Sequence, residues 1–279
     1  MIIRTIAKRL TENTKQPMLI DNRPGGSGAV GVNAMKQGNP DGYTVFLGHS
    51  GTHAINQSLI PNLSYDPVKD FEPVTVLWSF GHIAMVPANS PARTLSELVV
   101  LAKTKPGGLS YGSQGIGTGA HLMGEVFKKV AGTPMTHVPY KGSAQIIPDI
   151  LSGTLDLVFF NFVSASSYVK DGKLRMLAMA TAKRAKAFPD LPTFAELGFP
   201  GVEMDYWFGI LAPARTPGAI VTRLHDEFTK AARVPEFVRE MADQDIQVPL
   251  SAPAEFRALI AADTAKLGKI VRDAGASAE

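Results

Sequence analysis

The sequence changes from strand to helix most clearly at residues 109–121, which read LSYGSQGIGTGAH. We predict a buried strand over 109–112, a Gly-rich turn, and a helix over 119–131. Such a turn brings backbone N–H groups to a helix N-terminus, where the helix dipole favours an anion. Ser113 and Thr118 would add hydroxyl donors. The stretch therefore predicts an α/β protein in which this turn either binds an anion or is purely structural.

A dinucleotide cofactor is not expected at this turn. Residues 115–120 read GIGTGA, which meets only the looser form of the G-x-G-x-x-G fingerprint. That fingerprint also needs an acidic residue about 20 positions later, and the stretch around Met135 contains no Asp or Glu. No other cofactor is predicted.

Short apolar runs alternate with stretches of helical periodicity along the chain. Most runs are continuously apolar, which is typical of strands buried on both faces of a parallel sheet. Besides 109–112, the predicted strands are Met18–Ile20, Tyr43–Leu47, Ile83–Val86, Leu157–Phe160, Leu174–Ala180 and Trp207–Leu211. Besides 119–131, the predicted helices cover 2–14, 27–37, 143–152, 218–232, 235–243 and 253–273, and capping boxes at Thr94–Glu97 and Thr193–Glu196 would open two more. This order predicts mostly parallel, doubly wound sheets.

Two breaks in the pattern indicate where the chain divides. The length of 279 residues favours two domains at about 150 residues each. Lys105-Pro106-Gly107-Gly108 follows a predicted helix, and a second Pro-containing break spans 211–217. We therefore expect a discontinuous first lobe of residues 1–104 plus 209–279, and a second lobe of residues 105–208.

Composition excludes several classes of protein. A hydrophobic share of 45% with 19% charged residues is globular. The net charge of +3 comes without a basic cluster, so no nucleic-acid partner is expected. Cysteine is absent, which excludes disulfides, thiol nucleophiles and Cys-ligated metals. No apolar run approaches the roughly 18–20 residues that span a bilayer, so direct membrane insertion is not expected.

A second polar loop, GHSGTH at residues 48–53, follows a predicted strand. It resembles the G-x-S-x-G nucleophile elbow around Ser50 but has Thr52 in place of the last glycine. His49 and His53 lack a third metal ligand in the sequence pattern. We predict no catalytic residue and no metal site, and interpret Ser50, Thr52 and the later Asn161 as hydrogen-bond donors of a binding protein.

Eight stretches together resemble the solute receptors of tripartite tricarboxylate transporters, the Bug family. They follow the family order over nearly the whole chain: Asp21–Gly26, Pro40–Thr44, Asp70–Val74, Gly112–His121, His137–Gly142, Gly172–Arg175, Leu191–Thr193 and Trp207–Pro213.

The resemblance implies a two-lobed periplasmic-binding-protein type II fold that closes on a small di-, tri- or aromatic carboxylate. It implies a periplasmic, non-enzymatic, monomeric receptor whose partners are membrane transporter subunits. Carried over by position, the ligand contacts would be Ser50 and Thr52 from the first lobe and, from the second, Ser113, Gly117, Thr118, His121, Asn161 and Ser164.

Two departures from the family pattern shape the expectations. The chain opens directly in the predicted helix 2–14, so we expect that the export signal, the first strand and the first ligand loop are absent from it. Phe160 stands where many relatives carry Asp before the asparagine. We therefore expect a ligand without an ammonium group, with an aromatic ring able to stack on Phe160 or Trp207.

Two other functions stay open at this stage. The lack of an export signal favours a cytoplasmic ligand-sensing domain as one alternative. The loop around Ser50 leaves an α/β hydrolase as the other, although the sequence nominates no base for it.

Overall fold

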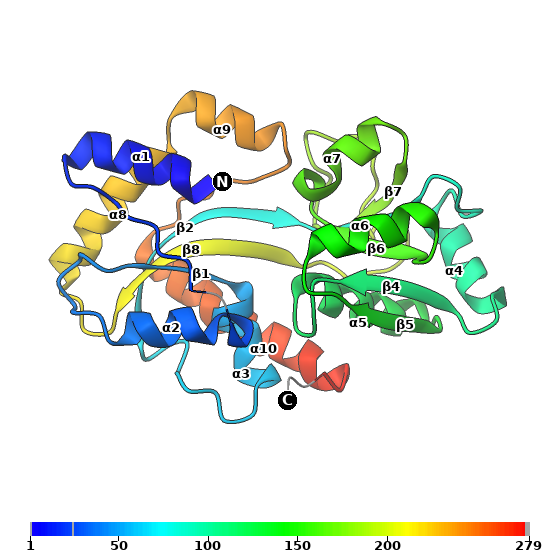
Figure 1. The fold of residues 1–279 in the computed structure, drawn as a ribbon, viewed down its shortest axis with the longest axis horizontal. Coiled ribbons are helices and arrows are strands. Elements are labelled where there is room, and N and C mark those ends of the chain that lie inside the picture. Colours follow the sequence, from blue (N-terminus) through cyan, green and yellow to red (C-terminus); the bar gives the residue numbers. More distant parts are fainter. Residues whose placement is uncertain (1, 24, 277–279) are drawn as a thin grey trace. The chain divides into compact units, whose positions relative to one another are not determined.

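The computed structural model describes residues 2–23 and 25–276. Within that part of the chain, two compact units are distinguished. Unit 1 comprises residues 2–79 and 207–272, and unit 2 comprises residues 80–206 and 273–276. Each unit is an α/β assembly, which confirms the predicted fold class (Figure 1).

The first change of unit lies earlier in the chain than predicted. The chain leaves unit 1 at Ser79 within β2 (Phe71–Gly81) and returns to it at Trp207 within β8 (Asp205–Pro213). The predicted boundary at 104/105 is wrong because β3 (Ile83–Pro87) pairs with two strands of the unit 2 sheet. The Pro-Gly-Gly break at 105–108 is therefore a loop inside unit 2.

Unit 2 is built on a five-stranded sheet with the order β5-β4-β6-β3-β7. Its further strands are β4 (Leu109–Ser113), β5 (Met135–Pro139), β6 (Leu157–Phe160) and β7 (Leu174–Met179). β4 is parallel to both β5 and β6, and β3 is antiparallel to both β6 and β7. Four strands thus run in one direction and β3 runs against them.

Four helices flank this sheet. They are α4 (Leu95–Thr104), α5 (Gly119–Ala131), α6 (Ser143–Ser152) and α7 (Phe162–Lys170). Thr94 caps α4 as predicted, because its hydroxyl accepts a 3.2 Å hydrogen bond from the Glu97 N–H. The second predicted box also forms, with Thr193 and Glu196 bonding reciprocally at 2.8 and 3.2 Å, but it closes a turn and not a helix.

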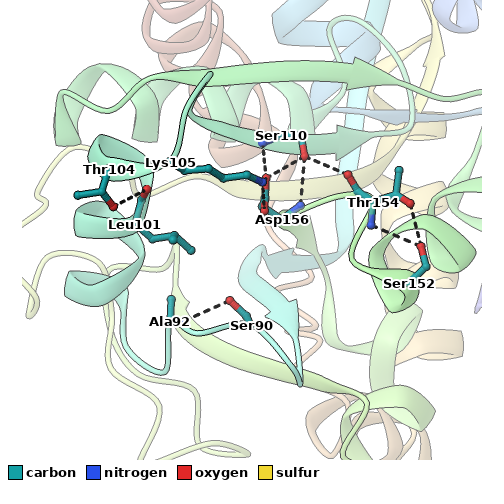
Figure 2. Close-up of polar contacts among 9 residues, drawn as sticks. All are labelled: Ser90, Ala92, Leu101, Thr104, Lys105, Ser110, Ser152, Thr154 and Asp156. Carbon is teal, nitrogen blue, oxygen red and sulfur yellow. Dashed lines mark hydrogen bonds and ion pairs between the residues drawn. The ribbon is translucent and has the colours of Figure 1, made fainter.

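Asp156 ties together the amino-terminal ends of β4 and β6 (Figure 2). Its carboxylate accepts hydrogen bonds from the backbone N–H of Ser110 at 2.8 Å and from the Ser110 hydroxyl at 3.0 Å. The Lys105 ammonium lies 2.6 Å from the same carboxylate. Charge-assisted bonds of this kind are stronger than neutral ones, so Asp156 holds the register of the two parallel strands.

Unit 1 contains a three-stranded sheet with the order β1-β8-β2. β1 (Phe46–His49) is antiparallel to β8. The helices of this unit are α1 (Ile2–Thr14), α2 (Ala29–Lys36), α3 (Asn56–Leu59), α8 (Gly218–Ala232), α9 (Pro235–Ala242) and α10 (Pro253–Asp273, its last residue in unit 2), with short turns η1 (Gly26–Gly28) and η2 (Gly51–Ile55). The long helices match the predicted ranges closely, and α1 lies along α8 (Figure 1).

The segment Met18–Ile20 is not a strand, contrary to the prediction. It stays outside both sheets, and Leu19 is 87% exposed. An apolar triplet becomes a strand only if a neighbouring strand pairs with it, and neither sheet takes up this segment.

Each unit has its own apolar core. In unit 2, Ile83, Met85 and Val158 of the central strands pack against Ile146 and Ile150 of α6. In unit 1, Trp207 and Leu211 of β8 pack with Val76 of β2 and with Phe256 and Ile260 of α10. Among the helices in the described part of the chain, none has the length and apolarity needed to cross a bilayer.

Replacing Asp156 by Ala tests its role in joining β4 to β6. The loss of its carboxylate leaves the Ser110 N–H without its acceptor, so we expect the free energy of unfolding to fall by about 2 kcal/mol in urea titrations. Asp171→Ala is the control, because Asp171 and Lys173 form a 3.4 Å pair with both side chains more than half exposed, and such pairs contribute little. Equal losses in the two variants would contradict the assignment.

Candidate ligand-binding site in unit 2

The four co-directional strands of unit 2 end at one edge of the sheet, which we call the carboxyl edge. The segments that follow them there are 114–118 after β4, 140–142 after β5, Asn161 after β6 and 180–181 after β7. Three helices, α5, α6 and α7, begin directly from these segments. Ligands of open α/β sheets bind at such edges, because loops and helix N-termini converge there.

Thr118 shapes the start of α5. Its hydroxyl accepts a 3.4 Å hydrogen bond from the His121 N–H and donates a 2.8 Å bond to the Gly115 carbonyl. Gly115 and Gly117 adopt φ angles of 123° and 77°, which disfavour residues with a Cβ. The predicted Gly-rich turn is therefore closed tightly onto the N-cap of α5.

Ser113, the last residue of β4, is fully buried beneath this turn. Its hydroxyl donates to the Gly115 carbonyl at 3.0 Å, accepts from the Gly115 N–H at 3.2 Å, and shares a 2.6 Å hydrogen bond with His137 Nε2. Ser113 thus supports the turn from below.

His121 and His137 lie against each other beneath the same turn, with ring centroids 4.1 Å apart and ring planes tilted by 31°. The Gly117 N–H donates to His121 Nδ1 at 3.1 Å, which requires that nitrogen to be unprotonated. Burial lowers the pKa of both rings, that of His137 to about 4 with a further contribution from His121. Both imidazoles are therefore neutral at pH 7. The single N–H of His137 donates to the Ser113 hydroxyl, whereas that of His121 lies on Nε2, outside these bonds.

Asn161 caps α7 on the neighbouring strand. Its Oδ1 accepts from the Ser164 N–H at 2.9 Å and from the Ser164 hydroxyl at 3.0 Å, so neither bond uses the side-chain NH₂. The third helix is linked to the turn as well, because Gln114 Nε2 donates to the Ser143 hydroxyl at the start of α6 at 3.2 Å. The carboxyl edge therefore joins three capped or bonded helix N-termini.

His82 belongs to this edge, although the sequence reasoning missed it. It precedes β3, and because Ile83 pairs with Phe160, His82 stands opposite Asn161 in the antiparallel register. A Cβ on Gly119 would lie 2.7 Å from His82 Cε1, so the ring rests on the first residue of α5. Its position as a lone polar residue directly before a continuously apolar strand is the sequence signal that could have identified it.

The structure gathers six of the eight predicted site residues at this edge of unit 2: Ser113, Gly117, Thr118, His121, Asn161 and Ser164. The other two, Ser50 and Thr52, lie in unit 1 and are fully buried. The Ser50 hydroxyl accepts a 3.0 Å bond from the Trp207 N–H, and the Thr52 hydroxyl bonds to the His49 backbone at 3.1 Å and to His53 Nδ1 at 2.9 Å. Ser50 thus joins the end of β1 to β8, and Thr52 closes the turn that follows β1.

The glycine-rich turn that precedes α2 is a structural element of unit 1. Gly25, Gly26 and Gly28 have positive φ angles, and a Cβ on Gly28 would lie 2.6 Å from Thr52 Cγ2. Pro24 of the same motif lies outside the described residues. The close approach to Thr52 explains why glycine is needed at position 28.

The two aromatic side chains expected to stack on a ligand do not present a ring face. Phe160 is 1% exposed within the core of unit 2, and Trp207 is 2% exposed with its Nε1 donating to Asp263 at 2.7 Å. The prediction that they stack on an aromatic ligand is therefore wrong, because both side chains are buried in the cores of their units. Among the described residues no cluster of three or more metal-binding side chains occurs.

The arrangement defines a two-unit α/β solute-binding protein, and comparison with known proteins agrees. The sequence profile of the "Tripartite tricarboxylate transporter family receptor" matches residues 2–276. Protein BugT of Bordetella pertussis is 30% identical over 280 residues, covering 99% of this chain and 85% of BugT. The chain therefore belongs to the tripartite tricarboxylate transporter receptor family, and the predicted Bug-family membership is confirmed.

Two solved structures show the same fold. One is Rpa4515 of R. palustris with adipate, with a TM-score of 0.91, 33% identity, and coverage of 99% of this chain and 93% of that one. The other is MatC of Rhodopseudomonas palustris with bound malate, with a TM-score of 0.86, 26% identity, and coverage of 97% and 93%. Both match this chain over nearly its whole length, which confirms the predicted fold class.

Gly119→Ala tests how tightly the start of α5 is packed. The added methyl would lie 2.7 Å from His82 Cε1 and 2.9 Å from Tyr206 Cδ2, so we expect the free energy of unfolding to fall by about 1–3 kcal/mol. Gly218→Ala is the matched control, since Gly218 also opens a helix but has nothing within 4 Å of its Cβ position. There the change should be neutral or stabilising. A loss at both positions would contradict the packing argument.

The pH dependence of stability tests the burial of His53. Burial, with a contribution from His49, lowers the pKa of His53 to about 3. Between pH 6.5 and pH 4 the unfolded chain thus binds more protons at this residue, so stability must fall as the pH falls. We expect His53→Gln to show a shallower decline of the unfolding free energy over that window. An unchanged slope would mean that His53 is protonated in the folded protein.

Proposed function

We propose that this chain is a periplasmic solute receptor that captures a small carboxylate for a tripartite tricarboxylate-type transporter. The observation that carries the proposal is the carboxyl edge of unit 2, where α5, α6 and α7 all begin. Helix N-termini favour negative charge. The family membership and the titles of two relatives, with adipate and with malate, support a carboxylate as the ligand.

The ligand contacts that we assign are Ser113, Gly117, Thr118, His121, Asn161 and Ser164. They combine neutral hydroxyl, amide, imidazole and backbone groups, and the rings of His121 and His137 are uncharged at pH 7. A carboxylate is thus held by oriented dipoles and not by an opposite charge, which lets it dissociate readily for delivery. Direct contacts from the Ser50 and Thr52 hydroxyls stay predictions, since these hydroxyls serve bonds inside unit 1. The same holds for the hydroxyls of Ser113, Thr118 and Ser164, which donate to acceptors inside unit 2.

The partners that we assign are a small di- or tricarboxylate and the membrane subunits of the transporter, with the receptor acting as a monomer and without a cofactor. Release of the ligand unchanged is part of this role. The buried, hydrogen-bonded Ser50 hydroxyl supports a receptor over a hydrolase, because a nucleophile must reach its substrate.

Calorimetric titration and thermal shift with a panel of acids test the function. The panel contains adipate, malate, citrate, benzoate, aspartate and glutamate. A true ligand at 100 times its Kd should stabilise the protein by about 2.7 kcal/mol, and NMR of the mixture should show no conversion of the acid. Turnover of a panel acid, or binding of none, would overturn the proposal.

Thr118→Ala tests the turn itself, with Thr94→Ala as the matched control. Both threonines cap helices of unit 2 through the same hydroxyl bond, at 3.4 Å and 3.2 Å. Each substitution should therefore lower the unfolding free energy by a similar amount, about 1 kcal/mol. We expect only Thr118→Ala to weaken binding of the panel acid, by roughly tenfold, because its hydroxyl also closes the Gly-rich turn through the Gly115 carbonyl. Equal affinities would remove Thr118 from the site.

A further inference from the structure

His82 is a buried polar side chain, and one of its ring nitrogens has no hydrogen-bond partner among the described residues. It is 7% exposed, and its Nδ1 is buried without a hydrogen-bond partner in the described chain. Buried polar atoms are nearly always paired, and leaving one unpaired costs about 1–3 kcal/mol. An apolar ring of similar size would avoid this cost, so the imidazole must serve something other than internal packing.

The backbone and the neighbouring rings hold His82 in place. Its carbonyl accepts a 2.8 Å hydrogen bond from the Ala180 N–H at the end of β7. Its ring meets Phe80 and Tyr206 edge to face, with centroids 5.8 and 6.1 Å away. The imidazole is therefore a fixed feature of the carboxyl edge.

The other nitrogen of the ring lies beside the helix that begins at this edge. Nε2 is 3.1 Å from the position that a Cβ on Gly119 would take, and Gly119 is the first residue of α5. Burial lowers the pKa of His82 to about 4, so the ring is neutral at pH 7 and carries a single N–H. If the hydrogen is on Nε2, the unpaired buried Nδ1 is an acceptor and no N–H donor is left buried without a partner.

We propose that His82 is a ligand-binding residue of unit 2, whose Nε2–H donates a hydrogen bond to the carboxylate held at the N-terminus of α5. This inference rests on the proposed function and adds a contact that comes from the antiparallel strand β3. Asn161, the N-cap of α7, is opposite His82 in register, and Gly119 beside its ring directly follows Thr118, the N-cap of α5, so His82 is next to the starts of both helices. The absence of a side chain at Gly119 lets the His82 ring lie against the first residue of α5.

The experiment compares His82→Phe, His82→Gln and a control, His225→Phe, by calorimetric titration with adipate and with malate. His225 lies on α8 of unit 1, and its Nε2 is likewise buried without a partner in the described residues. We expect His82→Phe to raise the Kd of the bound acid about tenfold or more. His82→Gln, whose amide can donate from a similar reach, should retain part of the affinity, and His225→Phe should retain all of it.

Thermal unfolding of the same variants separates a ligand contact from a structural role. Because Phe removes an unpaired buried polar atom, the melting temperature of His82→Phe without ligand should equal or exceed that of the wild type. Lost affinity with undiminished stability supports the inference. Wild-type affinity in His82→Phe overturns it.

A measurement on the unmodified protein covers the case in which His82→Phe does not fold. In ¹⁵N spectra of the histidine rings, saturation with adipate or malate should shift the His82 Nε2 resonance, and an unchanged resonance in a saturated sample overturns the inference. If the wild type binds no panel acid, the proposed function itself fails. If it binds an acid while the His82 variants and resonance stay unchanged, only the role of His82 is lost.

Discussion

The shared direction of β5, β4, β6 and β7 is the constraint on which the rest of unit 2 depends. Parallel strands end on the same side of a sheet, so each following helix must start there. The bonds of Asp156 fix the opposite ends of β4 and β6 (Figure 2). One local ion pair and one topological rule thus bring the N-cap of α5 and the N-cap of α7 to adjacent positions.

The sequence was most informative where the determinant of structure is local. Helices such as α5 and α10 follow from apolar periodicity and capping residues, and their ranges were predicted closely. Met18–Ile20 failed because strand formation needs a partner that no local pattern reveals. The predicted boundary at 104/105 was wrong for the same reason. A Pro-Gly-Gly break indicates a turn of any kind, and only the pairing of β3 with β6 shows that this turn lies inside unit 2.

The residues of the candidate site likewise fall into those that the sequence could identify and those that it could not. Ser113, Thr118 and Asn161 were found because they follow parallel strands in the chain, where polar residues end an apolar run. His82 was missed because it comes before its strand and reaches the edge only through the reversed direction of β3. The expectation for Phe160 was wrong because Phe160 only adjoins the candidate site residue Asn161, whereas its own side chain points into the core.

The reversed strand β3 has one more effect on unit 2. A strand that runs against its neighbours begins where they end, so the backbone arriving from Ser79 enters unit 2 at Phe80–His82, at the carboxyl edge of the sheet. The departing backbone leaves from the same place, because Tyr206 also packs against His82. The two connections at Ser79–Phe80 and Tyr206–Trp207 are therefore attached at the carboxyl edge of unit 2, where the candidate site lies.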